Sequence, residues 1–131
     1  MRSKAREAVF QYVFSRLFNQ NDEGLFAVLT RALKPEDGEF AKKLSDLVIV
    51  GDERYDGEIN VLSENFRPDR IFAADRCAIK IGMAELDAFT ETDVPIIIDE
   101  AVKLAAKFST ENSPDFVNGI LASYAKKTGR I

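Results

Sequence analysis

Apolar residues recur every three or four positions along nearly the whole chain, and no segment alternates apolar and polar residues as a half-buried strand does. The segment 3–18 is apolar around most of its circumference after Ala8, and the segment 71–86 shares this character. A helix of this kind is buried on most sides or covered by a partner. The spacing therefore predicts an all-α fold, a compact bundle of about six or seven helices.

Glycine and proline divide this pattern into separate helices. Pro35 and Gly38 mark a loop, and a long helical stretch follows over residues 39–66. Gly51 falls inside that stretch, where a glycine costs about 1 kcal/mol relative to alanine. We therefore expect a kink, a close helix crossing or a break near Gly51.

The last third of the chain contains two helices with distinctive first turns. Helix 95–108 begins at Pro95, whose missing N–H leaves no first-turn donor unsatisfied. Asn112 or Ser113 is suited to cap the final helix. Gly119 lies inside that final helix and predicts the close approach of another element.

Composition limits the possible functions. The chain has 131 residues, enough for a single domain over 1–131, with no histidine and one cysteine, Cys77. These counts exclude a Ser-His-Asp or Cys-His site, an internal disulfide and a cysteine-based zinc cluster. No glycine spacing matches a phosphate-binding loop, and no apolar run reaches membrane-spanning length or resembles a signal peptide. We expect a cytoplasmic protein that is not an enzyme and carries no metal or cofactor.

Charge is distributed unevenly along the chain. Residues 36–100 hold seventeen acidic and seven basic side chains. Residues 1–20 hold four basic and one acidic, and residues 101–131 hold five basic and two acidic. Basic ends on an acidic protein are suited to an anion such as nucleic acid, or are simply solvated.

Two groups near the N-terminus are candidates for RNA contacts. Arg2, Lys4 and Arg6 form either a phosphate-binding arm or a solvated end. The aromatic residues that follow can include a base-stacking platform, but most of them must belong to the core. We expect no more than one to be exposed among Phe10, Tyr12, Phe14 and Phe18.

Four segments together resemble the NusB family of bacterial transcription antitermination factors. They are Arg6-Glu before an aromatic-rich helix, Asp75-Arg-Cys-Ala-Ile-Lys-Ile-Gly-Met-Ala-Glu-Leu, Asp93-Val-Pro with Asp99-Glu-Ala-Val-Lys-Leu-Ala, and Asp115-Phe-Val-Asn-Gly-Ile-Leu. The last two are the most specific. The resemblance covers almost the whole chain, although residues 20–66 match only as a helical pattern.

The resemblance implies a function in transcription. NusB proteins bind the single-stranded boxA element of nascent RNA, notably in ribosomal RNA leaders, together with the small-subunit ribosomal protein NusE. That complex joins NusA and NusG on RNA polymerase and suppresses premature termination. The acidic middle of this chain is the expected docking surface for a basic ribosomal protein.

The resemblance also indicates particular residues. The family's RNA-facing positions fall on the basic arm Arg2, Lys4 and Arg6, on Phe14 in the first helix, and on Asn112 and Phe116 at the start of the last helix. Asp75 falls on an acidic position near the partner and RNA surface, although a carboxylate on a helix surface is often only solvated. We expect the arm to lie beside the start of the last helix, so that one RNA strand touches both.

Two other functions remain open from sequence. Some ribosomal RNA cytosine methyltransferases carry a NusB-like RNA-binding domain, and this chain resembles that domain as well. Alternatively, the chain is a protein-interaction module without an RNA role. Some members of the family form a homodimer that covers the RNA surface.

Overall fold

The computed structural model describes residues 2–18, 23–64, 66 and 70–131, which form seven α-helices and no strands. The helices are α1 (Ser3–Ser15), α2 (Glu23–Thr30), α3 (Pro35–Val50), α4 (Asp52–Ser63), α5 (Ala73–Ala88), α6 (Val94–Phe108) and α7 (Ser113–Lys127). The predicted all-α fold of six or seven helices is confirmed.

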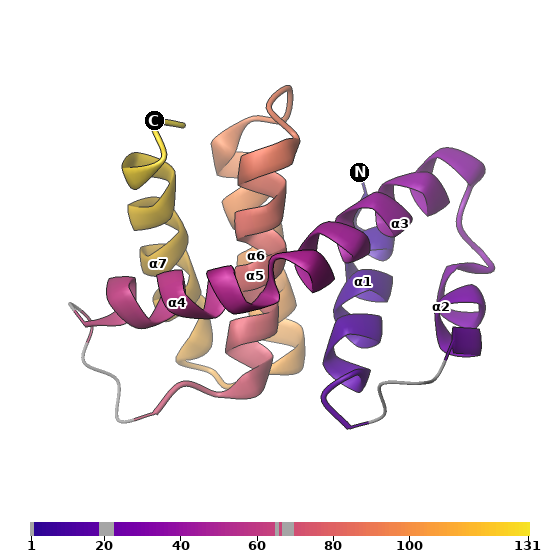
Figure 1. Ribbon diagram of the computed structural model, residues 1–131, viewed down its shortest axis with the longest axis horizontal. Coiled ribbons are helices and arrows are strands. Elements are labelled where there is room, and N and C mark those ends of the chain that lie inside the picture. Colours follow the sequence, from indigo (N-terminus) through magenta and orange to yellow (C-terminus); the bar gives the residue numbers. More distant parts are fainter. Residues whose placement is uncertain (1, 19–22, 65, 67–69) are drawn as a thin grey trace.

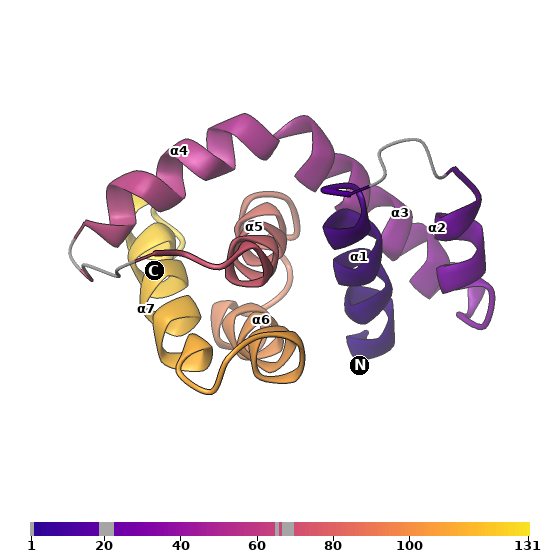
Figure 2. The same cartoon turned by 90° about the horizontal axis from the view of Figure 1, so that it is seen from below.

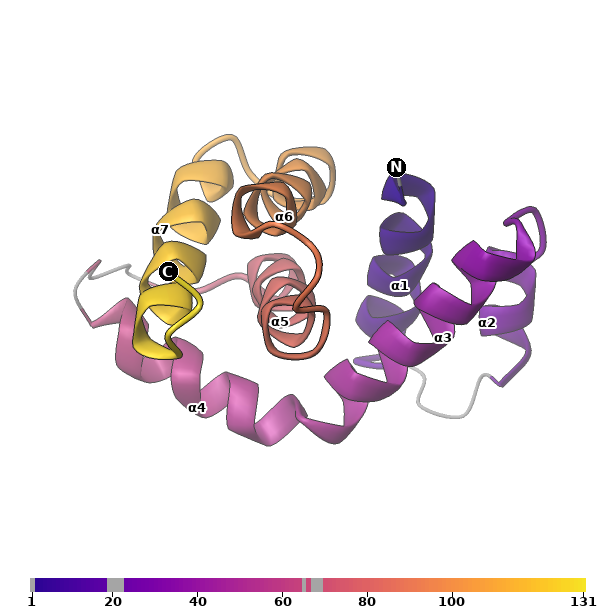
Figure 3. The same ribbon diagram turned by 90° about the horizontal axis from the view of Figure 1, so that it is seen from above.

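Helix α5 runs through the middle of the molecule, with α1, α6 and α7 packed around it (Figure 2). Every residue from Cys77 to Leu86 is buried, which agrees with the apolar girth seen in the sequence. Helices α3 and α4 form a bent arch along one side of this group, and α2 lies outside against α1 (Figure 3). Helices α1 and α6 run in the same direction, whereas α5 and α7 run in the opposite one (Figure 1).

The break expected near Gly51 is present, because α3 ends at Val50 and α4 begins at Asp52. A Cβ on Gly51 would lie 2.6 Å from the ring of Tyr55, so only glycine fits at this bend. The loop predicted at Pro35 and Gly38 is wrong. Pro35 starts α3, and the acidic residues that follow it favour the positive end of the helix dipole. Gly38 lies inside that helix, where the burial of neighbouring apolar residues outweighs its low propensity.

Gly119 permits the predicted close approach of another segment to the last helix. A Cβ on Gly119 would lie 2.5 Å from the ring of Phe66, which lies in a turn just after α4. Gly82 serves the same purpose in α5, where a Cβ would lie 2.6 Å from Leu121 and 3.3 Å from Ala101. The three-helix contact of α5, α6 and α7 therefore depends on Gly82.

We predict opposite effects of alanine at two helical glycines. Gly82→Ala forces Leu121 from its place in a close-packed core and lowers the free energy of unfolding by about 1 kcal/mol, despite the gain in helix propensity. Gly57→Ala, at an exposed position with no atom within 4 Å of the added Cβ, raises it by about 0.5–1 kcal/mol. Urea unfolding of both variants measures this, and equal stabilisation by both would contradict the packing described.

Candidate nucleic-acid interface

Arg6 is buried and fully engaged by two carboxylates. Its Nε and Nη2 atoms lie 2.6 and 2.7 Å from the two carboxylate oxygens of Glu85, and Nη1 lies 3.0 Å from Oε1 of Glu100. The side chains of Arg6, Glu85 and Glu100 are 5%, 1% and 2% exposed. This cluster, which we call the Arg6 ion cluster, links α1, α5 and α6.

The expectation that Arg6 belongs to an exposed arm is therefore wrong. Burial by itself lowers the pKa of Arg6, but the hydrogen bonds and negative charges of Glu85 and Glu100 outweigh it, and the pKa is raised. The guanidinium also lies over the ring of Phe40, with its carbon 5.2 Å from the ring centroid. Arg6 stabilises the helix packing and offers no surface to a phosphate.

The exposed part of the arm consists of Arg2 and Lys4. Arg2 packs over the ring of Phe40 at 4.5 Å and lies 3.6 Å from the Asp37 carboxylate. Both basic residues are at the start of α1, which lies above the start of α7 in Figure 1 but on the same side of the molecule in Figure 3. The arm and the start of α7 lie on either side of α6, and the contact of one RNA strand with both stays a prediction.

Helix α6 separates the arm from the start of α7. Phe10 stacks on Phe108 with ring centroids 4.6 Å apart, and Lys107 pairs with Glu7, so the end of α6 lies beside the middle of α1. Helix α6 lies between α1 and α7 in both end views (Figure 2 and Figure 3), and the first turn of α7 follows on the far side of α6. The thirteen residues of α1 correspond to about 20 Å of helix between the two ends.

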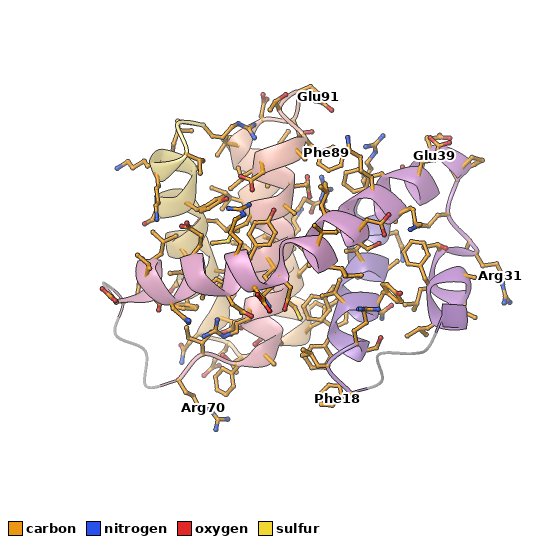
Figure 4. All side chains as sticks on the ribbon, viewed as in Figure 1. Phe18, Arg31, Glu39, Arg70, Phe89 and Glu91 are labelled. Atoms are coloured by element: carbon orange, nitrogen blue, oxygen red, sulfur yellow. The ribbon has the colours of Figure 1, made fainter. Side chains whose placement is uncertain are left out.

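Aromatic residues gather where α1 ends. Phe14 is half-buried between Phe10 and Phe18, with ring centroids 5.8 and 5.4 Å away. Phe18 is 75% exposed, whereas Phe10 is buried and Tyr12 is half-buried. The prediction of no more than one exposed aromatic among these four is confirmed. Phe18 lies at the same end of the molecule as Arg70 (Figure 4).

A surface hollow lies at this same end, between α5 and the start of α7, and it joins three of the predicted site residues. It is lined by Arg70, Phe72, Asp75, Thr110, Asn112, Ser113 and Phe116. We call it the α5–α7 hollow. Asp75, Asn112 and Phe116 thus meet, although the first is far from the others in sequence.

Asp75 supports the hollow from within. Its side chain is buried, and Oδ1 accepts a hydrogen bond of 2.5 Å from Ser109. Ser113 donates in turn to the Ser109 hydroxyl at 3.0 Å, which fixes the turn between α6 and α7. Asp75 is therefore not a solvated carboxylate on a helix surface, because it holds this turn against α5, and its contact with a partner stays a prediction.

Asn112 and Phe116 present polar and aromatic atoms to the hollow. Asn112 is exposed at the N-cap position of α7, yet its side chain makes no capping hydrogen bond. Phe116 is half-buried and meets the ring of Phe66 edge-on, with centroids 6.0 Å apart. The site therefore offers an uncommitted amide beside an aromatic face.

Sequence reasoning missed Arg70 and Phe72. The guanidinium carbon of Arg70 lies 4.8 Å from the centroid of the Phe72 ring. Phe72 is 38% exposed at the N-cap of α5. The sequence offered one signal for this pair, namely a basic residue and an aromatic residue two positions apart just before a helix. That pattern matches no RNA-binding motif.

The described residues give little support for a reactive cysteine, a metal site or a membrane span. Burial raises the pKa of Cys77 to about 12, so its thiol stays protonated at neutral pH. The ranges 2–18, 23–64 and 70–131 contain no cluster of three possible metal-binding side chains. None of the described helices is long and apolar enough to cross a bilayer.

Comparison with known proteins gives a family. Residues 3–126 match the model of the NusB family. The chain belongs to the NusB family. The transcription antitermination protein NusB of Streptomyces griseus is 35% identical over 131 residues, which cover 94% of this chain and 90% of that protein.

Solved NusB structures share the fold. NusB of T. maritima superposes with a TM-score of 0.81 at 30% identity, over 97% of this chain and 92% of that one. A chain from a crystal structure of the antitermination factors NusB and NusE in complex with double-stranded RNA gives a TM-score of 0.80 at 27% identity, over 96% of each chain.

Proposed function

We propose that this NusB-family protein is a cytoplasmic transcription antitermination factor that binds single-stranded boxA RNA together with NusE. One observation carries the proposal. Aromatic rings and an uncommitted amide meet in the α5–α7 hollow of a chain in the NusB family. A NusB protein of the same fold has been solved with NusE and double-stranded RNA. The rings and the amide are suited to holding and reading unstacked bases, which is how proteins recognise single-stranded RNA by sequence.

Base contacts carry most of the recognition in this proposal. With Arg6 buried, the arm contributes only Arg2 and Lys4 to phosphate binding. Phe14, Asn112 and Phe116 are the proposed base contacts. An RNA strand that reached the arm as well as these base contacts would gain phosphate binding from Arg2 and Lys4. That charge would act at a distance from the bases that are read.

NusE docks, in this proposal, on helix α4 of the arch. Helix α4 begins with Asp52 and Glu53 and also carries Asp56 and Glu58. Glu53 is exposed, whereas the other three pair with Lys80, Arg76 and Lys127 of α5 and α7. Two apolar side chains flank these carboxylates, because Val50 is 87% exposed and Val61 is 55% exposed. Negative charge around an apolar patch fits a basic ribosomal protein. NusA, NusG and RNA polymerase join the resulting complex.

A titration of fluorescent boxA RNA, followed by anisotropy, tests this function. We expect modest affinity for the protein alone and higher affinity when NusE is present, since NusE adds its own RNA-binding surface. About three neutralised phosphates give a slope of log affinity against log salt of roughly −2. No binding in either condition would refute the proposal, and equal affinity in both would refute the part played by NusE.

A homodimer without an RNA role is the alternative that one observation favours. Leu17 and Phe18 are 54% and 75% exposed at neighbouring positions, and a second copy would cover them. Light scattering with and without boxA RNA separates the two. A dimer that persists at saturating RNA, with no RNA bound, would replace the proposed function.

A further inference from the structure

We propose that Arg70 and Phe72 form a nucleotide clamp, which holds one unstacked base of single-stranded RNA over the α5–α7 hollow and neutralises its phosphate. This inference rests on the proposed RNA-binding function and assigns two residues to it. Neither was selected by the family resemblance. The clamp supplies the positive charge that the buried Arg6 does not.

The backbone holds Phe72 in place. Phe72 has an extended conformation, with φ −69° and ψ 146°, immediately before α5. Its carbonyl oxygen accepts a hydrogen bond of 3.1 Å from the amide of Arg76, in the first turn of that helix. The backbone of Phe72 is thereby fixed at the rim of the hollow, and its partly exposed ring packs against Arg70. A base that stacks on this ring requires less additional ordering of the protein than a flexible loop would.

The charge of Arg70 is available to a ligand. Within the described part of the chain Arg70 makes no ion pair, whereas Arg54 and Arg76 each lie within 3.0 Å of a carboxylate. Asp75, the carboxylate of the hollow, is buried, and its Oδ1 accepts a hydrogen bond from Ser109. The Arg70 guanidinium therefore lies over an aromatic ring without a competing anion in contact, which suits it to bind a phosphate or stack on a base.

The lining of the hollow specifies the class of ligand. Phe72 and Phe116 offer ring surface to a base, and the Asn112 amide offers both a donor and an acceptor to a base edge. Bases inside an A-form duplex cannot reach such a site, because their faces are stacked on one another. The clamp therefore selects a single strand over a duplex.

Two variants and a matched control test the clamp. Arg70→Met and Phe72→Leu each remove one half of it. Arg31→Met removes the same charge from an exposed residue just after α2, remote from the hollow (Figure 4). Each variant is titrated with a single-stranded RNA that contains boxA, and with the same RNA annealed to its complement. Thermal melts establish that all three variants are folded.

We expect each clamp variant to lose about fivefold in affinity for the single strand, and Arg70→Met to make the salt slope shallower by about 0.7. Arg31→Met should bind as wild type does. If wild type binds and the clamp variants match Arg31→Met, the clamp is wrong and the proposed function stands. If wild type does not bind, the proposed function itself fails. Lost NusE binding with unchanged RNA affinity would assign this surface to NusE and overturn the clamp.

Discussion

Arg6→Met is expected to lower the free energy of unfolding by about 3–5 kcal/mol, because it leaves Glu85 buried without its cation and Glu100 with only Lys103, 3.6 Å away. Glu85 and Glu100 are almost fully buried, and neither can turn into water without disturbing the core. For a domain of this size the loss corresponds to a drop in melting temperature of roughly 10–20 °C. Calorimetry or urea unfolding at neutral pH measures it.

A double variant distinguishes lost pairing from lost packing. Arg6→Met with Glu85→Leu removes one of the stranded charges, so it should be more stable than Arg6→Met alone. Arg2→Met, which removes an exposed arginine from the same helix end, should change stability by less than about 1 kcal/mol. Equal losses in Arg2→Met and Arg6→Met would contradict the description of the Arg6 ion cluster.

Phe116→Ala is expected to reduce the affinity for boxA RNA by about tenfold, since base stacking on an aromatic side chain contributes about 1–3 kcal/mol per base. Phe116 lies in the α5–α7 hollow beside the uncommitted Asn112 amide. Anisotropy titration at fixed salt measures the loss. The salt slope should not change, because no phosphate contact is removed.

Phe26→Ala is the matched control for this loss. Phe26 is also a half-buried aromatic in a helix, but it packs edge-on against Tyr12 in the α1–α2 contact. Both variants lose stability through lost packing, so titrations are made well below either melting temperature. RNA affinity that falls equally in both variants would show that the effect is not local, and the hollow would then lose its proposed function.

Local features of the fold were predictable from the sequence. The helical period, the start of α6 beside Pro95 and the break at Gly51 depend on neighbouring residues, whose propensities act in any tertiary context. The loop predicted at Pro35 was wrong because proline and glycine also occur within helices, where burial of the other residues outweighs a local preference. Such competition is not visible in a short window.

The site was less predictable, since its residues have distant partners. Arg6 contacts carboxylates 79 and 94 positions away, and Asp75 contacts Ser109 34 positions away. Nothing near either residue reveals that it is buried. The separation of the arm from the start of α7 depends on the placement of α6 between α1 and α7, which hydrophobic periodicity does not encode.

The most direct test of the central claim is NMR chemical-shift mapping of the isotopically labelled protein during titration with single-stranded boxA RNA. We predict that the largest shifts fall at one end of the molecule, on amides of residues 14–18, 70–76 and 110–117, with smaller ones at Arg2 and Lys4. Shifts confined to α2 and the first turns of α3, with the α5–α7 hollow unchanged, would contradict the account.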